Sequence, residues 1–132
     1  MRYIEEEVQI SCVTWFRLQY HELALLLYHV PNGGKRGKVE AARFKAMGVQ
    51  RGVSDLCLDV ARSGYHGLRI EMKKISGDSR QSEEQRKWQE AVEAQGYKYA
   101  VCRSLEEFIT IVENYLGKKR KEDIRDVMRN WK

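Results

Sequence analysis

The sequence predicts a mixed α/β domain, in which a small mixed central sheet is flanked by helices. Short apolar runs alternate along the chain with segments whose apolar residues recur every three or four positions. One of these runs is followed by a turn and a second run, which is typical of a β-hairpin. The length of 132 residues suits one domain with one hydrophobic core. Strands and helices that alternate in this way favour a sheet covered by helices.

The first helix is expected over residues 3–20, where Val8 and Cys12 follow the helical period within an apolar stripe. Glu5 lies on the flank of this stripe, so its carboxylate can reach a site against which the stripe packs. Glu6 points the opposite way. The alternative for Glu5 is a solvated helix N-terminus, where acidic side chains interact favourably with the helix dipole.

A buried strand is expected over residues 24–30, an apolar run that ends at a proline. The glycine-rich turn after it and the cations beside it are candidates for DNA binding: Asn32, Gly33, Gly34, Lys35, Arg36 and Lys38. Exposed amides and nearby cations can contact a phosphate backbone, and a plain surface loop is the alternative. The turn lacks the GxxxxGK[ST] order of a nucleotide-binding loop, so no nucleotide cofactor is expected.

Four further elements are expected in addition to a hairpin. A short helix over residues 38–47 is closed by a glycine, and Arg51 beyond it is a candidate phosphate contact. A helix with capping residues at its start runs from Ser82 to Gly96, and Gln85, one turn inside it, could face the hairpin. The remaining elements are a strand over residues 97–103 and a helix over residues 104–116.

The stretch between the short helix and Ser82 contains the predicted hairpin. Residues 56–60 and 68–72 are apolar enough to be its strands, and residues 63–67 form the turn.

This hairpin carries ionisable groups that a soluble core normally avoids. Asp55 enters the first strand, while Glu71 and Lys73 are two residues apart on the second and share a face. Two carboxylates and an ammonium are costly to desolvate at one sheet edge, and a Mg²⁺ or Mn²⁺ ion bound through oxygen offsets that cost. The alternative is an ordinary ion pair of Glu71 with Lys73 or Lys74 at a strand edge.

The motifs of the chain, taken in order, resemble those of a known nuclease family. The D-x(15)-E-x-K pattern of the hairpin resembles the PD-(D/E)xK signature, although Ser54 stands in place of the proline. More narrowly, the chain resembles the VRR-NUC family of that superfamily, in its standalone bacterial and phage type. Four parts match in order: Glu5, Pro31-Asn32-Gly33-Gly34 with Arg36, Gly48-x-x-x-Gly52-x-x-Asp55, and Glu71-x-Lys73 followed by Ser82-x-x-Gln85-x-x-Trp88.

The resemblance implies a restriction-endonuclease-like core and a Mg²⁺- or Mn²⁺-dependent DNA endonuclease. It implies that Asp55, Glu71 and the backbone carbonyl of Met72 hold the metal, and that Glu5 completes the site directly or through water. Lys73, assisted by Gln85, would position the attacking water.

Standalone members of the family resemble Holliday-junction resolvases, so branched DNA is the expected substrate. Two symmetric cuts require two active sites, and a homodimer would supply them. A flap or duplex nuclease acting in repair and a non-catalytic DNA-binding module are the alternatives.

Positive charge is concentrated at the C-terminal end. Residues 117–132 contain seven basic and three acidic residues, which accounts for +4 of the net charge of +5. We therefore expect a VRR-NUC-like nuclease domain over residues 1–116 and a basic helical tail over residues 117–132. Further candidate contacts to DNA are Lys74, Lys118, Lys119, Arg120 and Lys121. A dimer clasp, a membrane-surface helix and a solubilising helix remain alternatives for the tail.

Composition excludes several other classes of protein. A hydrophobic content of 42% with 33% charged residues favours a compact domain over disorder. No apolar run approaches the ~20 residues needed to span a bilayer, and the acidic N-terminus lacks the apolar core of a signal peptide. A cytoplasmic protein of a bacterial cell or a phage is therefore expected. Cys12, Cys57 and Cys102 lack paired spacing, so buried thiols are expected instead of disulfides or a zinc site.

Overall fold

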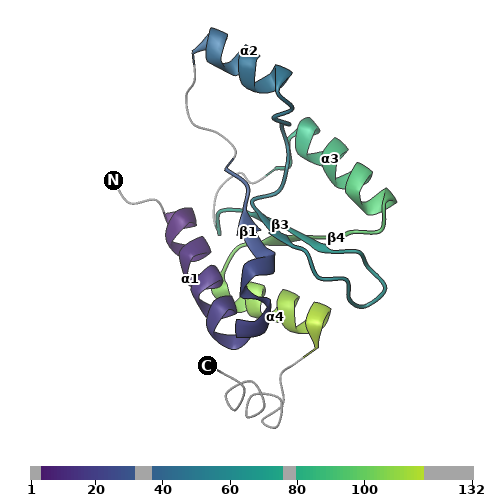
Figure 1. Ribbon diagram of the computed structural model, residues 1–132. Coiled ribbons are helices and arrows are strands. Elements are labelled where there is room, and N and C mark those ends of the chain that lie inside the picture. Colours follow the sequence, from purple (N-terminus) through teal and green to yellow (C-terminus); the bar gives the residue numbers. More distant parts are fainter. Residues whose placement is uncertain (1–3, 32–36, 76–79, 118–132) are drawn as a thin grey trace.

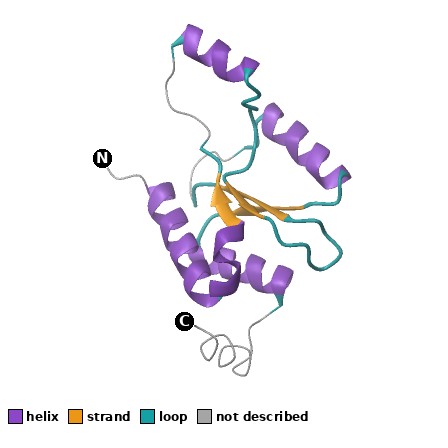
Figure 2. Cartoon of the chain, viewed as in Figure 1, coloured by secondary structure: helices purple, strands orange, loops and turns teal. Residues whose placement is uncertain are grey.

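A four-stranded sheet lies at the centre of the protein, with helices on both of its faces (Figures 1 and 2). The computed structural model describes residues 4–31, 37–75 and 80–117. Its strands are β1 (Leu27–His29), β2 (Leu56–Leu58), β3 (Leu68–Met72) and β4 (Lys98–Cys102). Its helices are α1 (Ile4–Gln19), the 3₁₀-helix η1 (His21–Leu26), α2 (Lys38–Ala46), α3 (Glu83–Ala94) and α4 (Leu105–Leu116).

The strands follow the order β1-β2-β3-β4, and the sheet is mixed. β1 and β2 are antiparallel, as are β2 and β3, whereas β3 and β4 are parallel. A parallel pair requires a crossover connection, and α3 supplies it between β3 and β4. The sequence prediction of a small mixed sheet flanked by helices is therefore confirmed.

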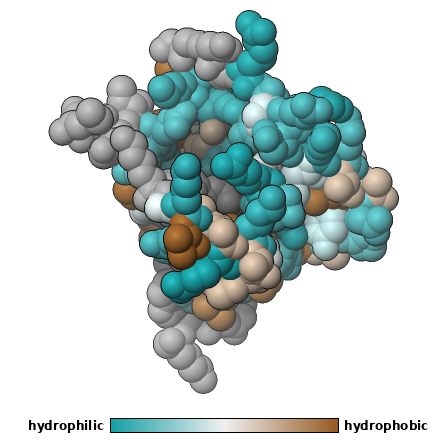
Figure 3. Space-filling view, turned by 90° about the horizontal axis from the view of Figure 1, so that it is seen from above, coloured by the Kyte–Doolittle hydropathy of each residue, from teal (hydrophilic) through white to brown (hydrophobic). Residues whose placement is uncertain are grey.

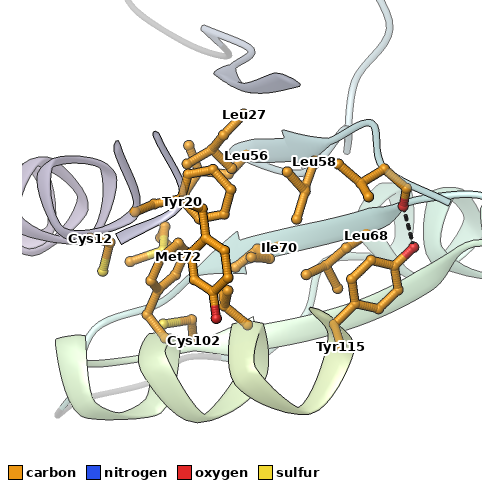
Figure 4. Packing of buried hydrophobic residues seen from close by; sticks show 14 residues of the cluster. Cys12, Tyr20, Leu27, Leu56, Leu58, Leu68, Ile70, Met72, Cys102 and Tyr115 are labelled. Atoms are coloured by element: carbon orange, nitrogen blue, oxygen red, sulfur yellow. Dashed lines mark hydrogen bonds between the residues drawn. The ribbon is translucent and has the colours of Figure 1, made fainter. Parts of the chain in front are cut away.

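The side chains of β3 divide the domain into two layers. Leu68, Ile70 and Met72 are buried in the main core, which α1 and α4 cover from one side (Figures 1 and 4). Because side chains alternate along a strand, Arg69, Glu71 and Lys73 point to the opposite face, on the side of α3. One face of β3 therefore packs in the apolar core, and the opposite face carries polar side chains.

Each expected helix is present close to its expected bounds. The apolar stripe of α1 is confirmed by Cys12 and Phe16, which are both fully buried. α4 packs through Phe108, Val112 and Tyr115, and it ends at Leu116 as expected. Among the described residues, no helix has both the length and the apolar content needed to cross a membrane. Apart from its first residue, the expected tail lies outside the described residues.

The prediction of a strand over residues 24–30 is wrong for the first half of this segment. η1 occupies His21–Leu26, and β1 begins only at Leu27. The 3₁₀ turn leaves the side chain of Leu25 96% exposed while Leu23 packs against the core. The strand is not buried throughout either, since Tyr28 is exposed on a strand that pairs only with β2. An apolar run alone does not distinguish a short helical turn from a strand.

The three cysteines are free and buried, as expected. Cys12 from α1 and Cys102 from β4, which are distant in sequence, interact through their side chains. Cys102 also donates from Sγ to the carbonyl of Ser104 at 3.2 Å.

Candidate active site

The hairpin formed by β2 and β3 brings together the two carboxylates of the predicted site. Leu56 pairs with Ile70, so the next step of the antiparallel register places Asp55 opposite Glu71. Residues that are directly opposite in such a pair project to the same face with closely spaced side chains. Glu71 is central in the sheet and only 4% exposed, whereas Asp55 is half-buried at the start of β2.

Backbone groups fix the orientation of the Asp55 carboxylate. Asp55 Oδ2 accepts a hydrogen bond from the amide of Met72 at 2.8 Å. A strand residue directs its N–H and C=O to the same neighbour, so the Met72 carbonyl also faces the Asp55 side. The Asp55 carbonyl accepts from the amide of Val30 at 2.9 Å and contacts His29 Nδ1 at 2.7 Å. The aspartate is thus held from both neighbouring strands.

Gln85 connects α3 to the face of the hairpin that carries the carboxylates. Its side-chain Oε1 accepts from Lys73 Nζ at 3.0 Å, and its Nε2 donates to Glu71 Oε1 at 3.3 Å. The same Oε1 accepts from the amide of Ser82 at 3.0 Å, while Ser82 Oγ accepts from the amide of Gln85 at 3.1 Å. This reciprocal pair is a capping box, which satisfies two amides at the start of the helix. One side chain therefore caps α3 and joins Glu71 to Lys73.

The acidic pair has a strongly perturbed electrostatic environment. Burial raises the pKa of Glu71 to about 9, and the hydrogen bond and negative charge of Asp55 act in the same direction. The ammonium of Lys73 opposes this shift, while the charge of Glu5 adds to it. Two adjacent carboxyl groups in a water-poor position cannot both remain ionised without a compensating cation.

The metal-free protein is expected to lose stability as the pH rises from about 4.5 to about 9. Glu71 ionises near 4.5 when its surroundings are ordinary, but it retains its proton to about 9 in the fold. The folded state therefore binds more protons than the unfolded state in this window, and the free energy of unfolding falls with pH. Thermal melts in EDTA, from about pH 5 to about pH 8.5, would measure this fall. Glu71→Gln should flatten the profile, and parallel profiles for both proteins would contradict the expectation.

The carboxylates open into a pocket of about 300 Å³ between the hairpin, the segment before it and the start of α3. Its lining residues are Arg51, Gly52, Val53, Asp55, Glu71, Ser82, Glu84 and Gln85. Arg51, a predicted phosphate contact, is exposed and brings a positive charge to the pocket. Viewed from the end of the molecule that bears α2, the surface is largely hydrophilic (Figure 3). Three carboxylates and one guanidinium line the pocket, so its interior suits a cation.

Sequence reasoning missed why the glycine at position 52 is needed. Gly52 has a φ of +84°, and a Cβ there would overlap the carbonyl of Glu84 and lie 2.9 Å from the amide nitrogen of Gln85. The backbone of the pre-hairpin segment thus lies directly against the first turn of α3. The spacing of Gly52 from Asp55 indicated a special position, but its contact with α3 follows only from the tertiary structure.

The donor set of the site fits a divalent metal that prefers oxygen. Asp55, Glu71 and the Met72 carbonyl supply two carboxylates and one carbonyl at the same end of the two central strands, β2 and β3. In the part of the chain that the structure describes, no group of three or more His, Cys, Asp or Glu residues is placed to hold a metal. Glu5, at the exposed start of α1, is near enough for its charge to act on Glu71 without joining such a group.

The other predicted DNA contacts are dispersed. Lys38 begins α2 and Lys74 follows β3, and both are exposed. The carbonyl of Lys74 accepts from Arg103 Nη1 at 2.7 Å, which joins the backbone beyond β3 to the residue that follows β4. The remaining candidates lie outside the described residues: Asn32, Gly33, Gly34, Lys35, Arg36, Lys118, Lys119, Arg120 and Lys121.

Comparisons with known proteins identify the family of the chain. The family model described as the VRR-NUC domain matches residues 4–106, from the start of α1 to the start of α4. A solved structure described as "VRR_NUC domain protein" is 35% identical in sequence and superposes with a TM-score of 0.73. That match covers 87% of this chain and 89% of the other. No curated protein matches the sequence. The protein belongs to the VRR-NUC domain family, a nuclease-type family with a restriction-endonuclease-like fold.

Proposed function

We propose that the protein is a Mg²⁺- or Mn²⁺-dependent DNA endonuclease. The observation that carries this proposal is the carboxylate pair of half-buried Asp55 and buried Glu71, which stand opposite each other beside Lys73 and Gln85. A carboxylate with a pKa near 9 and another carboxylate beside it are poorly suited to a purely structural role. Membership of a nuclease-type family makes nucleic acid the natural ligand of the pocket.

Asp55, Glu71 and the carbonyl of Met72 would hold the metal, and Glu5 would contribute through a water molecule or directly. When bound, the ion supplies Lewis-acid stabilisation of the negative charge that develops on the scissile phosphate. Asp55 is already oriented for binding by the Met72 amide, so little rearrangement is needed when the ion arrives.

Lys73 would position the attacking water. Its ammonium is half-buried, and Gln85 Oε1 accepts from Nζ at 3.0 Å, which limits the positions the ammonium can take. An ammonium in this place stabilises negative charge on the incoming oxygen and on the phosphate. Arg51, which lines the same pocket, would bind a phosphate next to the scissile one.

The proposed substrate is branched DNA of the Holliday-junction type, cut by a homodimer. The described residues of one chain form one such site, and a junction needs two symmetric cuts. A two-fold symmetric dimer would present two sites at a fixed separation. The cationic positions at Lys38 and Lys74, together with those of the glycine-rich turn and the tail, would hold the DNA arms.

A cleavage assay on matched substrates tests this proposal. A synthetic four-way junction, a flap and a plain duplex with the same sequence arms would be incubated with Mn²⁺, with Mg²⁺ and with EDTA. Metal-dependent cutting of the junction at paired positions is the expected result. Preferred cutting of the flap or duplex would favour a repair nuclease, and DNA binding without any cutting would favour a non-catalytic module. Light scattering on the same preparation would test the dimer.

Glu5 can be separated from its neighbour by substitution. Glu5→Ala should slow metal-dependent cleavage by about tenfold, because loss of a water-mediated metal partner typically costs 10–100-fold. Glu6→Ala is the matched control, since this residue is also exposed in the first turn of α1 and the helical period is expected to turn it away from the site. Equal losses in the two variants would reject a role for Glu5 in the metal site.

A further inference from the structure

Tyr99 carries a buried hydroxyl whose role the catalytic residues do not explain. The residue is 7% exposed in β4, and its ring makes an edge contact with Trp88 of α3 at a centroid distance of 6.2 Å. Within the described ranges, its hydroxyl oxygen is the one buried side-chain N or O atom without a hydrogen-bond partner. An unsatisfied buried hydroxyl destabilises the folded state, whereas phenylalanine would fill the same space without this cost.

The parallel register places this hydroxyl close to the carboxylates. Tyr99 pairs with Arg69 and Val101 pairs with Glu71, so Tyr99 is a diagonal neighbour of Glu71. Both side chains project to the face that α3 covers. Burial raises the pKa of Tyr99 to about 12, and the charge of Glu71 acts next in the same direction. The phenol is therefore a proton donor near Glu71.

Gln81 is the other polar group close to the hydroxyl. A side-chain hydrogen-bonding interaction with Gln81 lowers the pKa of Tyr99, so this amide lies nearby. Gln81 Nε2 donates to Gln89 Oε1 at 2.6 Å, and by distance and angle no hydrogen bond joins Gln81 to the phenol oxygen. On the Glu71 side, Oε1 accepts only a long hydrogen bond of 3.3 Å from Gln85 Nε2. The Glu71 carboxylate thus has capacity for a further donor.

We propose that Tyr99 is a positioning residue of the metal site. Its hydroxyl donates to the Glu71 carboxylate when the divalent ion is bound, directly or through one buried water, and so holds the carboxylate in its ligating orientation. Gln85 from α3 and Tyr99 from β4 then support Glu71 with two separate donors. This inference rests on the proposed metal-dependent function. Partners of this kind typically change metal affinity by about 10–100-fold when they are removed.

Calorimetric titration of the full chain with Mn²⁺ tests the inference without relying on cleavage. Tyr99→Phe should weaken Mn²⁺ binding by about tenfold. Its melting temperature should stay unchanged or rise, because only an unpartnered hydroxyl is removed. In cleavage assays, the half-saturating Mg²⁺ concentration should rise by a similar factor, while the rate at saturating Mg²⁺ should remain near that of the wild type.

Tyr97→Phe is the matched control, because Tyr97 lies two residues away on the same face and its ring stacks on Arg69 at 4.5 Å. It should bind Mn²⁺ as the wild type does. Equal Mn²⁺ affinity in the wild type and in Tyr99→Phe would overturn the inference. If Tyr99→Phe does not fold, an NMR experiment on ¹³C-labelled wild type takes its place. The Cζ resonance of Tyr99 should then shift on addition of Mg²⁺. An unchanged resonance would overturn the inference.

Asp55→Asn distinguishes a failure of the Tyr99 inference from a failure of the proposed metal site. If Asp55→Asn loses Mn²⁺ binding and Tyr99→Phe retains it in full, the inference fails and the metal site stands. If Asp55→Asn binds Mn²⁺ as tightly as the wild type does, the proposed metal site fails and the inference fails with it.

Discussion

Replacing Asp55 with asparagine, or Glu71 with glutamine, is expected to abolish DNA cleavage while leaving DNA binding close to that of the wild type. Each substitution keeps the shape of the side chain but removes a negatively charged oxygen ligand from the metal site. Loss of the site should reduce the rate by at least about 100-fold, because the charge on the scissile phosphate then develops without compensation. Cleavage of the preferred substrate in Mn²⁺, together with a binding assay in EDTA, would measure both effects.

Glu84→Gln is the matched control for these substitutions. Glu84 lines the same pocket and is changed by the same acid-to-amide replacement, but it is exposed on α3 and is no proposed ligand. Its cleavage rate should remain within about twofold of the wild type, since an exposed charge is well screened by solvent. Wild-type cleavage by Asp55→Asn or Glu71→Gln would show that the catalytic site is elsewhere.

Gly52→Ala is expected to impair both stability and cleavage. The positive φ of +84° is unfavourable for alanine, and the new Cβ would overlap the backbone of Glu84 at the start of α3. Backbone strain and overpacking together should cost about 2–4 kcal/mol of the free energy of unfolding. Relief of the overlap requires α3 to move away, which would displace Gln85 from Lys73 and Glu71. Denaturant unfolding and cleavage assays would measure the two effects.

Gly48→Ala separates strain from steric overlap. Gly48 also has a positive φ, of +105°, but nothing lies within 4 Å of a Cβ built there. It should cost only about 1–2 kcal/mol and leave cleavage of the folded protein unchanged. If Gly52→Ala behaves like Gly48→Ala, the contact with α3 does not position the site.

Local sequence signals accounted for most of the fold. The hairpin strands, the caps of α3 and α4, and the helical stripe of α1 all depend on residues that are close together in the chain. Ser82 and Gln85, for example, form the predicted helix start with their own side chains. The segment at residues 24–30 was misassigned because its apolar run is compatible with either structure. Only the position of β1 at the sheet edge decided where the strand begins.

The sequence by itself determined the identity of the candidate site: two carboxylates and a lysine at a spacing that a hairpin brings to one face. Periodicity places Glu71 and Lys73 together, because side chains two residues apart on a strand share a face whatever surrounds them. The antiparallel register of the hairpin then sets Asp55 opposite Glu71. Only the tertiary structure decided that Gln85 joins Lys73 to Glu71, that Gly52 abuts α3, and that the hydroxyl of Tyr99 is buried near the carboxylates. These contacts connect elements that are separated in sequence, and their distances depend on how α3 crosses from β3 to β4. The reactivity of the carboxylates depends on the same packing, because burial, which the sequence pattern does not specify, contributes most to raising the pKa of Glu71.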